Sequence, residues 1–178
     1  MMFFTQTEQY ETLVIGQYGR PEDYPDIEAY DQLLFYIQRN QNRNTVVYEA
    51  NCLYNGLLDL NDPISINWIK FMDNGEEEIQ PLNYIQKKLA YGYNFKVISN
   101  DLIEFCFVSY SEMKFYLSKN KNGGFHVSTT LDGIMSIIER IYIYAEDMGI
   151  FPQVKFAEFF GRCATTNKST YKKLFLQL

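Results

Sequence analysis

Short apolar segments that alternate with polar positions run through most of the chain from Leu33 onward. Ile64, Ile66 and Trp68, for example, alternate with two polar residues, which is the period of a half-buried strand. β-Branched and aromatic residues fill the other segments of this kind. We predict strands at 33–38, 45–52, 64–71, 93–98, 102–108, 113–118, 125–130 and 154–160. Such segments recur about every ten residues, the rhythm of β-sandwiches and barrels.

Residues 81–91 have a helical period instead. Three aliphatic residues recur there at helical spacing, Pro81 suits a first helical position, and Gly92 is a typical stop. We therefore predict one short helix at this point in the chain.

The segment 134–145 fits two structures. Four isoleucines lie at helical spacing, whereas Ile141 to Tyr144 read as a strand that is apolar on both faces. We predict a strand at 137–145 because isoleucine and tyrosine favour extended backbone, and a helix is the alternative.

The predicted fold class is all-β with minor α: an antiparallel β-sandwich or barrel of about 8–10 strands with one short helix near 81–91. Residues 1–31 show no sustained period, but their tyrosine and leucine content is too high for a disordered tail. We predict an irregular N-terminal arm at 1–31 that packs on a single β-rich domain at 32–178.

Composition narrows the function classes. The 178 residues suit one domain, and a net charge of −6 opposes general attraction to nucleic-acid phosphates. We expect no nucleic-acid partner and, since no apolar run approaches the ~18 residues of a spanning helix, no membrane span. No export signal is visible, which predicts a cytoplasmic protein. Two of the three cysteines lie in apolar runs, so we expect Cys52, Cys106 and Cys163 to be reduced and buried; one disulfide with a free thiol is the alternative.

Three strings of residues are distinctive as text: LFYIQRNQNRNTVVYEAN at 34–51, PI and NWIKF within 63–71, and LNYIQKKLAYG at 82–92. They resemble one uncharacterised bacterial family that is catalogued only as a domain of unknown function. The resemblance extends through IYIYAEDMGIFPQVKFAEFFG at 141–161 and so covers most of the chain. The family implies no established activity, and the resemblance therefore supplies no catalytic residue.

The most unusual local composition is a run of seven hydrogen-bonding side chains at 38–44. Arg39 and Arg43 can each present a planar fork to a carboxylate or phosphate, and Asn42 and Asn44 can complete a polar shell. A solvated hairpin loop is the simpler interpretation, and it is the one that composition favours.

Aromatic residues give three further candidates for ligand binding. Thirty residues are Phe, Tyr or Trp, and large aromatic side chains chiefly supply buried area. We expect Trp68 to anchor the core on the same side as its alternating neighbours, with ligand stacking as the alternative. Tyr84 and Tyr91 frame the predicted helix, where packing is the simpler role.

Few residues of the chain suit a catalytic role. The only histidine, His126, lacks the sequence context of a catalytic triad, and no ligand spacing for a metal is present. Glu104 and Glu158, which lie in apolar strands, are the best candidates for a catalytic acid, although an exposed strand face is the simpler expectation for both. We assign no catalytic residue, no metal ligand and no cofactor.

Three functions follow in order of preference. The first is a non-enzymatic protein that binds a small apolar or amphipathic molecule, and an internal cavity of several hundred cubic ångströms is the feature that it requires. The second is a homodimer or protein partner that docks on an aromatic patch or a sheet edge. The third is a hydrolase-like enzyme that uses Glu104 or Glu158 together with Arg39 or His126 in a cleft.

Overall fold

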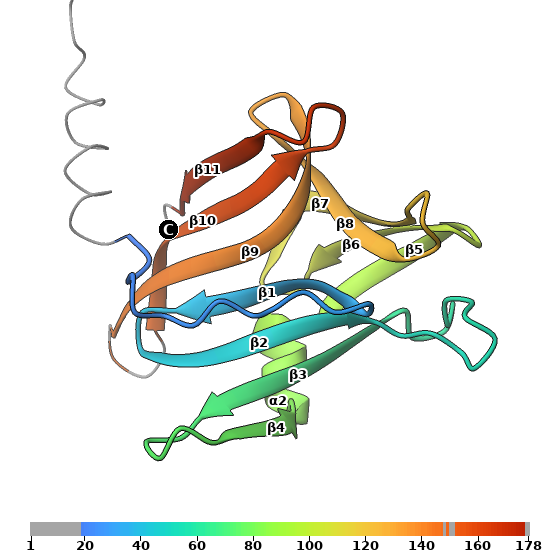
Figure 1. Ribbon diagram of the computed structural model, residues 1–178. Coiled ribbons are helices and arrows are strands. Elements are labelled where there is room, and N and C mark those ends of the chain that lie inside the picture. The colour runs from blue at the N-terminus through green and yellow to red at the C-terminus, as the bar shows by residue number, and fades with distance from the viewer. Residues whose placement is uncertain (1–18, 148, 150–151, 177–178) are drawn as a thin grey trace, which may run out of the picture.

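A computed structural model describes residues 19–147, 149 and 152–176, which form a curled sheet and one short helix (Figure 1). The strands are β1 (Leu33–Arg39), β2 (Asn42–Ala50), β3 (Ile64–Phe71), β4 (Glu77–Pro81), β5 (Tyr93–Ser99), β6 (Leu102–Phe107), β7 (Tyr110–Lys119), β8 (Phe125–Leu131), β9 (Ile134–Asp147), β10 (Pro152–Cys163) and β11 (Ser169–Phe175). The helix consists of an α-helical part, α2 (Tyr84–Gln86), and a π-helical part, η1 (Lys87–Tyr91).

The strands follow one another in the order β4-β3-β2-β1-β9-β8-β7-β6-β5, and β10 with β11 branches from β9. All neighbouring strands are antiparallel except β1 and β9, which are parallel. The long path curls into a half-barrel, so the predicted all-β class with minor α is confirmed.

Strand β9 causes the curl because three strands pair with it. β10 occupies one edge along residues 136–147. β8 pairs with residues 134–137 and β1 with 140–143, so these two strands share the opposite edge and diverge from it. At a register shift in the β9–β10 pair, a Cβ on Gly161 would clash with the carbonyl oxygen of Ile137, which explains the glycine.

The main core fills the concave side. As predicted, Ile64, Ile66 and Trp68 face the same side, and all three belong to this core. Aromatic rings stack across the curl, with 4.5 Å between the ring centroids of Phe35 and Tyr48. The prediction that Trp68 anchors the core is confirmed.

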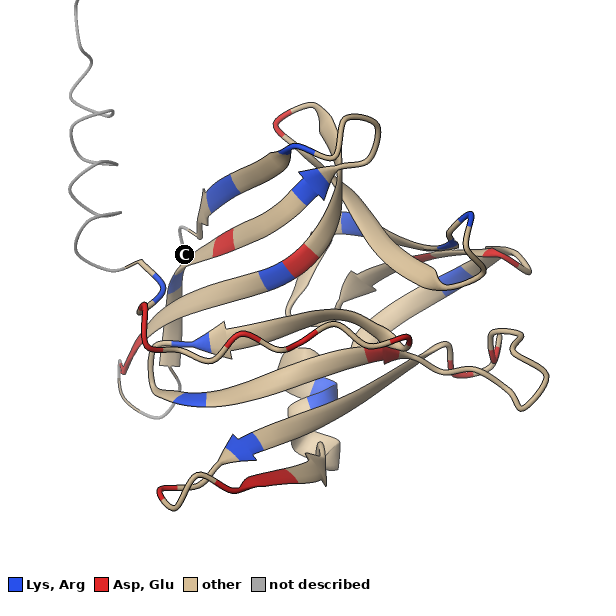
Figure 2. Ribbon diagram, in the orientation of Figure 1, with Lys and Arg blue, Asp and Glu red and all other residues tan. Residues whose placement is uncertain are grey.

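The convex side carries a smaller buried cluster of Tyr36, Val47 and Ile69, against which Ile27 packs. Figure 2 shows acidic residues along the segment before β1 and on β4. The described part of the predicted arm thus contacts the sheet, whereas residues 1–18 lie outside the described residues. Its division from a domain at 32–178 stays a prediction.

Several predicted boundaries were wrong. Pro81 ends β4 and does not begin a helix; the helix begins after Asn83, whose side chain accepts a hydrogen bond from the backbone N–H of Gln86. Strands β4 and β11 were missed, and β4 begins inside an acidic run at 76–78. The choice of a strand at 137–145 is confirmed by β9.

The polar run at 38–44 was also predicted wrongly as a loop. β1 continues to Arg39 and β2 begins at Asn42, so only Asn40 and Gln41 form the turn. The cause is that the strands continue through polar residues at the end of the sheet, where hydrogen bonds to neighbouring strands outweigh local composition.

The cysteines agree with the sequence only in part. Cys52, Cys106 and Cys163 are all free thiols, as expected. None is buried, however: Cys52 is exposed and the other two are half-buried. An apolar neighbourhood in the sequence did not predict burial here, because alternation sends every second residue of a strand to the other face.

Candidate functional site

A cavity of about 380 Å³ lies on the concave side of the sheet. Strands β1, β6, β7, β9, β10 and β11 and the helix contribute its walls, which are mostly apolar. Among the lining residues are Ile37, Phe115, Ile141, Ile143, Val154 and Phe159. Leu89 of the helix also lines the cavity while its side chain stays exposed, so the cavity opens beside the helix.

Arg39 brings a positive charge to this apolar wall. Among the described residues that line the cavity, it is the only charged one. Its Cζ lies 5.9 Å from the ring centroid of Trp68 and 5.6 Å from that of Tyr91. These two rings meet edge to face at 5.4 Å. Cation–π contact stabilises the guanidinium there but leaves its planar donors free for an anion.

The local backbone holds Arg39 in place. The hydroxyl of Tyr24 donates to the Arg39 carbonyl at 2.8 Å, and the Asn40 backbone N–H donates to the carbonyl of Ile143 at 3.2 Å. The Asn40 side chain donates to the carbonyl of Ala145 at 2.9 Å and accepts from its N–H at 3.0 Å. The end of β1 is thereby fixed to β9 next to the cavity.

Tyr91 is the second polar group of interest. It is 5% exposed and lines the cavity, and its hydroxyl oxygen is buried without a hydrogen-bond partner in the described part of the chain. Burial raises the pKa of Tyr91 and the charge of Arg39 lowers it. The backbone is anchored, because the Tyr48 hydroxyl donates to the Tyr91 carbonyl at 2.8 Å.

The residues that the sequence grouped with Arg39 lie elsewhere. Arg43 is exposed and lies on the convex side near Tyr24, where its charge partly offsets the rise that burial causes in the pKa of Tyr24. Asn42 and Asn44 make structural hydrogen bonds: the Asn42 side chain accepts from the N–H of Asn44 at 3.0 Å, and that of Asn44 accepts from the N–H of Phe71 at 3.2 Å. The two guanidinium groups therefore do not converge.

Trp68 and Tyr84 are also separated. Trp68 is 9% exposed and reaches the site through its contact with Arg39. Tyr84 is 73% exposed and lines a different, shallow groove of about 830 Å³ between β3, the helix and β5. Lys88 lies over the Tyr84 ring at 5.6 Å, which is a surface contact. Tyr84 thus does not take part in the cavity.

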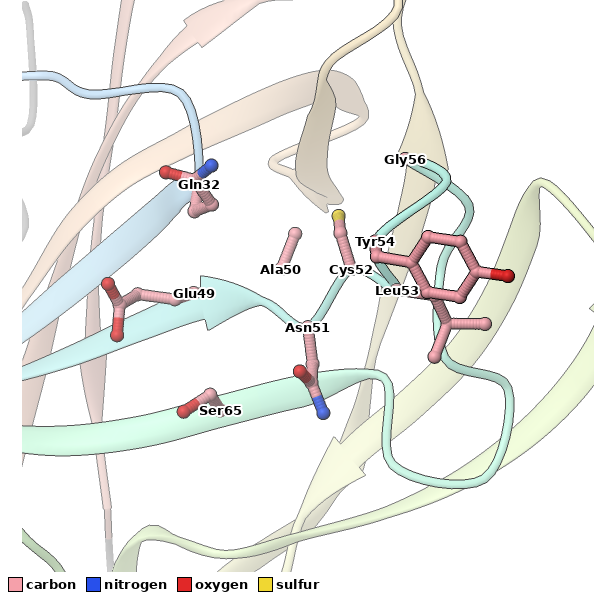
Figure 3. A pocket seen from close by; sticks show the side chains of 9 residues that line it. All are labelled: Gln32, Glu49, Ala50, Asn51, Cys52, Leu53, Tyr54, Gly56 and Ser65. Atoms are coloured by element: carbon pink, nitrogen blue, oxygen red, sulfur yellow. The ribbon is translucent and has the colours of Figure 1, made fainter.

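A third hollow lies at the end of β2, and Figure 3 shows its lining side chains. Its carboxylate is already satisfied: Glu49 accepts hydrogen bonds from the Tyr30 hydroxyl at 2.9 Å and from Asn67 at 3.0 Å. Burial raises the pKa of the Cys52 thiol, which reduces its reactivity. Completed contacts make this hollow a poorer ligand site than the cavity.

The candidate acids do not meet Arg39 or His126 in a cleft. Glu104 forms an ion pair with Lys114 at 3.0 Å. Glu158 is only 3% exposed and accepts a 2.6 Å hydrogen bond from Tyr171, so the expectation of an exposed strand face was wrong for this residue. Its neighbours on either side line the cavity, which places Glu158 on the convex face, where Tyr171 of the paired strand β11 reaches it.

Two further features, a metal site and a membrane-spanning helix, are not found among the described residues. They contain no cluster of three His, Cys, Asp or Glu side chains able to hold a metal ion. None of their helices is long and apolar enough to cross a membrane.

Sequence reasoning found Arg39, Trp68 and Tyr91 but missed most of the cavity wall. Alternation along 137–145 and 154–160 indicates which residues share a face. It does not indicate that this face is concave, and it gave no reason to single out Asn40, whose side chain fixes β1 to β9.

The fold and site define an all-β protein with a curled sheet around an apolar cavity that contains one arginine. Residues 35–173 match the domain of unknown function DUF4833, and the chain belongs to this family. No curated protein and no solved structure matches the chain significantly.

Proposed function

We propose that this protein binds a small amphipathic molecule in the concave cavity and does not transform it. The observation that carries the proposal is the cavity itself: about 380 Å³ of mostly apolar space within an otherwise packed core. Small-molecule sites have volumes of about 300–1,000 Å³ and combine apolar walls with a few polar groups. Arg39, Tyr91, Ser109 and Tyr110 are the polar residues in this wall.

A binding role fits the arrangement better than catalysis. The polar groups near the cavity supply positive charge and a hydroxyl, whereas the two candidate acids lie away from them. A hydrolase needs an acid or base within hydrogen-bond reach of the substrate. A binding site needs only apolar area and one or two orienting contacts.

The test uses 1-decanol, a neutral amphiphile, and measures thermal unfolding with and without it. A ligand present at about a hundred times its Kd stabilises the folded state by about 2.7 kcal/mol, which raises Tm by roughly 5–10 °C for a chain of this length. Ala157→Leu extends a side chain into the cavity and should abolish the shift. Ala164→Leu, at an exposed position after β10, is the matched control and should keep it.

A protein partner is the second candidate, and the edge strand β5 favours it. Phe95, Val97 and Ile98 are exposed, and the sheet path ends at this strand. We propose a second copy of this chain as the partner, because two identical free edges can pair antiparallel about a twofold axis. Size-exclusion chromatography with light scattering tests it: a monomer at high concentration contradicts the proposal, and a dimer that Val97→Lys disrupts supports it.

A further inference from the structure

Arg39 differs from the other arginines that are not fully exposed. Arg20, Arg140 and Arg162 each have a carboxylate oxygen within 3.0 Å. The half-buried guanidinium of Arg39 has no ion pair or side-chain hydrogen bond with any residue in the described ranges. Its planar donors are therefore available for an ion pair with an anionic ligand in the cavity.

The buried hydroxyl of Tyr91 also lacks a hydrogen-bond partner in the described part of the chain. An unsatisfied buried hydroxyl costs about 1–3 kcal/mol, and a ligand acceptor would remove that cost. Tyr91 is next to the guanidinium, since the Cζ of Arg39 lies 5.6 Å from its ring centroid. The two groups together offer a planar cationic fork and a neutral hydrogen-bond donor, which is the complement of a carboxylate.

We infer that the ligand is a monocarboxylic acid whose carboxylate binds Arg39 and the Tyr91 hydroxyl while its apolar part fills the cavity. This inference rests on the function proposed above and specifies its ligand class. One lining cation matches one negative charge, whereas a phosphate dianion would leave charge uncompensated in an apolar wall. At about 30 Å³ per water-sized group, the cavity holds roughly a dozen non-hydrogen atoms.

Decanoate, 1-decanol and decylamine test the inference, because they share one apolar chain and differ in the charge of the head group. Isothermal titration calorimetry measures the Kd of each for the full chain. We expect decanoate to bind about tenfold to a hundredfold more tightly than 1-decanol, which is the range of a charge-assisted hydrogen bond. Decylamine should bind most weakly, because its ammonium would face the guanidinium.

Three variants locate the effect. Arg39→Gln should weaken decanoate binding by about tenfold to a hundredfold and change 1-decanol binding by less than about threefold. Arg43→Gln removes the same charge from the convex side and should change neither. Tyr91→Phe should weaken decanoate binding by about threefold to tenfold, because it removes one hydrogen bond to the carboxylate but leaves the ion pair with Arg39.

The outcomes separate the two proposals. If decanoate and 1-decanol bind equally well, or if decylamine binds as tightly as decanoate, the carboxylate inference is wrong and the cavity proposal stands. If none of the three probes binds, the cavity proposal fails and this inference fails with it. Because the comparison of head groups uses the unmodified chain, it decides the matter even where Arg39→Gln does not fold. Arg39→Lys, which keeps the charge but loses the fork, should then show an intermediate affinity for decanoate.

Discussion

Arg39 and Arg140 lie on the paired strands β1 and β9 but on opposite faces of the sheet, and their surroundings differ. Arg140 donates to Asp26 at 3.0 Å and lies over the ring of Phe160 at 4.5 Å. Arg20 donates to the same carboxylate at 2.9 Å. Arg39 has two aromatic rings beside it, and no carboxylate of the described residues forms an ion pair with it.

The two faces of the sheet also differ in how tightly their side chains pack. On the convex face Phe156 is 1% exposed and its ring stacks on that of Tyr144 at 5.1 Å. Its neighbour Ala157 faces the concave side and leaves open space there. The convex face is thus closely packed around these rings, whereas the concave face keeps an open volume beside Arg39 and the Tyr91 hydroxyl.

The largest expected effect comes from a substitution that disturbs the pairing of β9 with β10. Gly161→Ala places a Cβ against the carbonyl oxygen of Ile137, so the β9–β10 backbone must shift, and we expect the free energy of unfolding to fall by about 2–3 kcal/mol. Urea denaturation followed by circular dichroism measures the change.

Ala157→Leu is the matched comparison on the same strand, because it adds more atoms but next to open space. We expect it to change the free energy of unfolding by less than about 1 kcal/mol in either direction. If Ala157→Leu costs as much as Gly161→Ala, the space beside Ala157 is not open, and the contrast between the two faces loses its basis.

A smaller effect distinguishes the two arginines. Arg140→Met removes an ion pair and a cation–π contact and should lower the free energy of unfolding by about 1 kcal/mol. Arg39→Met removes an unpaired charge from a half-buried position, so the ligand-free protein should be as stable as the wild type or more stable. Chemical denaturation of both variants without ligand checks this. A larger loss for Arg39→Met than for Arg140→Met would show that Arg39 has a structural role.

The smallest expected effect is a loss of folding stability at alkaline pH, and it depends on tyrosines of the convex face. Burial raises the pKa values of Tyr36 and Tyr171; Arg140 partly offsets the rise at Tyr36, and the carboxylate of Glu158 adds to the rise at Tyr171. Folding therefore favours the neutral phenols, and that stability is fully present below the unfolded pKa of about 10 and is lost as the pH rises above it.

Urea midpoints measured between neutral pH and strongly alkaline pH should accordingly decrease above about pH 10. Tyr171→Phe removes one of the titrating groups and should make that decrease shallower, whatever it does to stability at neutral pH. An unchanged slope in the variant would contradict the assignment. Absorbance of tyrosinate gives an independent record of the same ionisation.

Edge strands show why part of the fold was not visible in the sequence. β4 begins with two glutamates, and β11 contains Lys172 and Lys173, so neither reads as an apolar alternating strand. Such composition is common at sheet edges, where charge discourages pairing with other chains. Only the pairing of these strands with β3 and β10 identifies them as strands.

The amino-acid sequence by itself determined the all-β class, most strand positions, the end of the helix at Gly92 and the inward face of Trp68, because alternation and β-propensity are local properties. Tertiary structure decided that Arg39 and Arg43 face opposite sides and that a cavity lies beside Arg39. The cavity depends on β1 and β8 sharing one edge of β9, and the β1–β9 pairing joins residues such as Arg39 and Ile143 that are far apart in the chain. A local pattern carries no information about such pairing, and for that reason the site emerged only from the folded molecule.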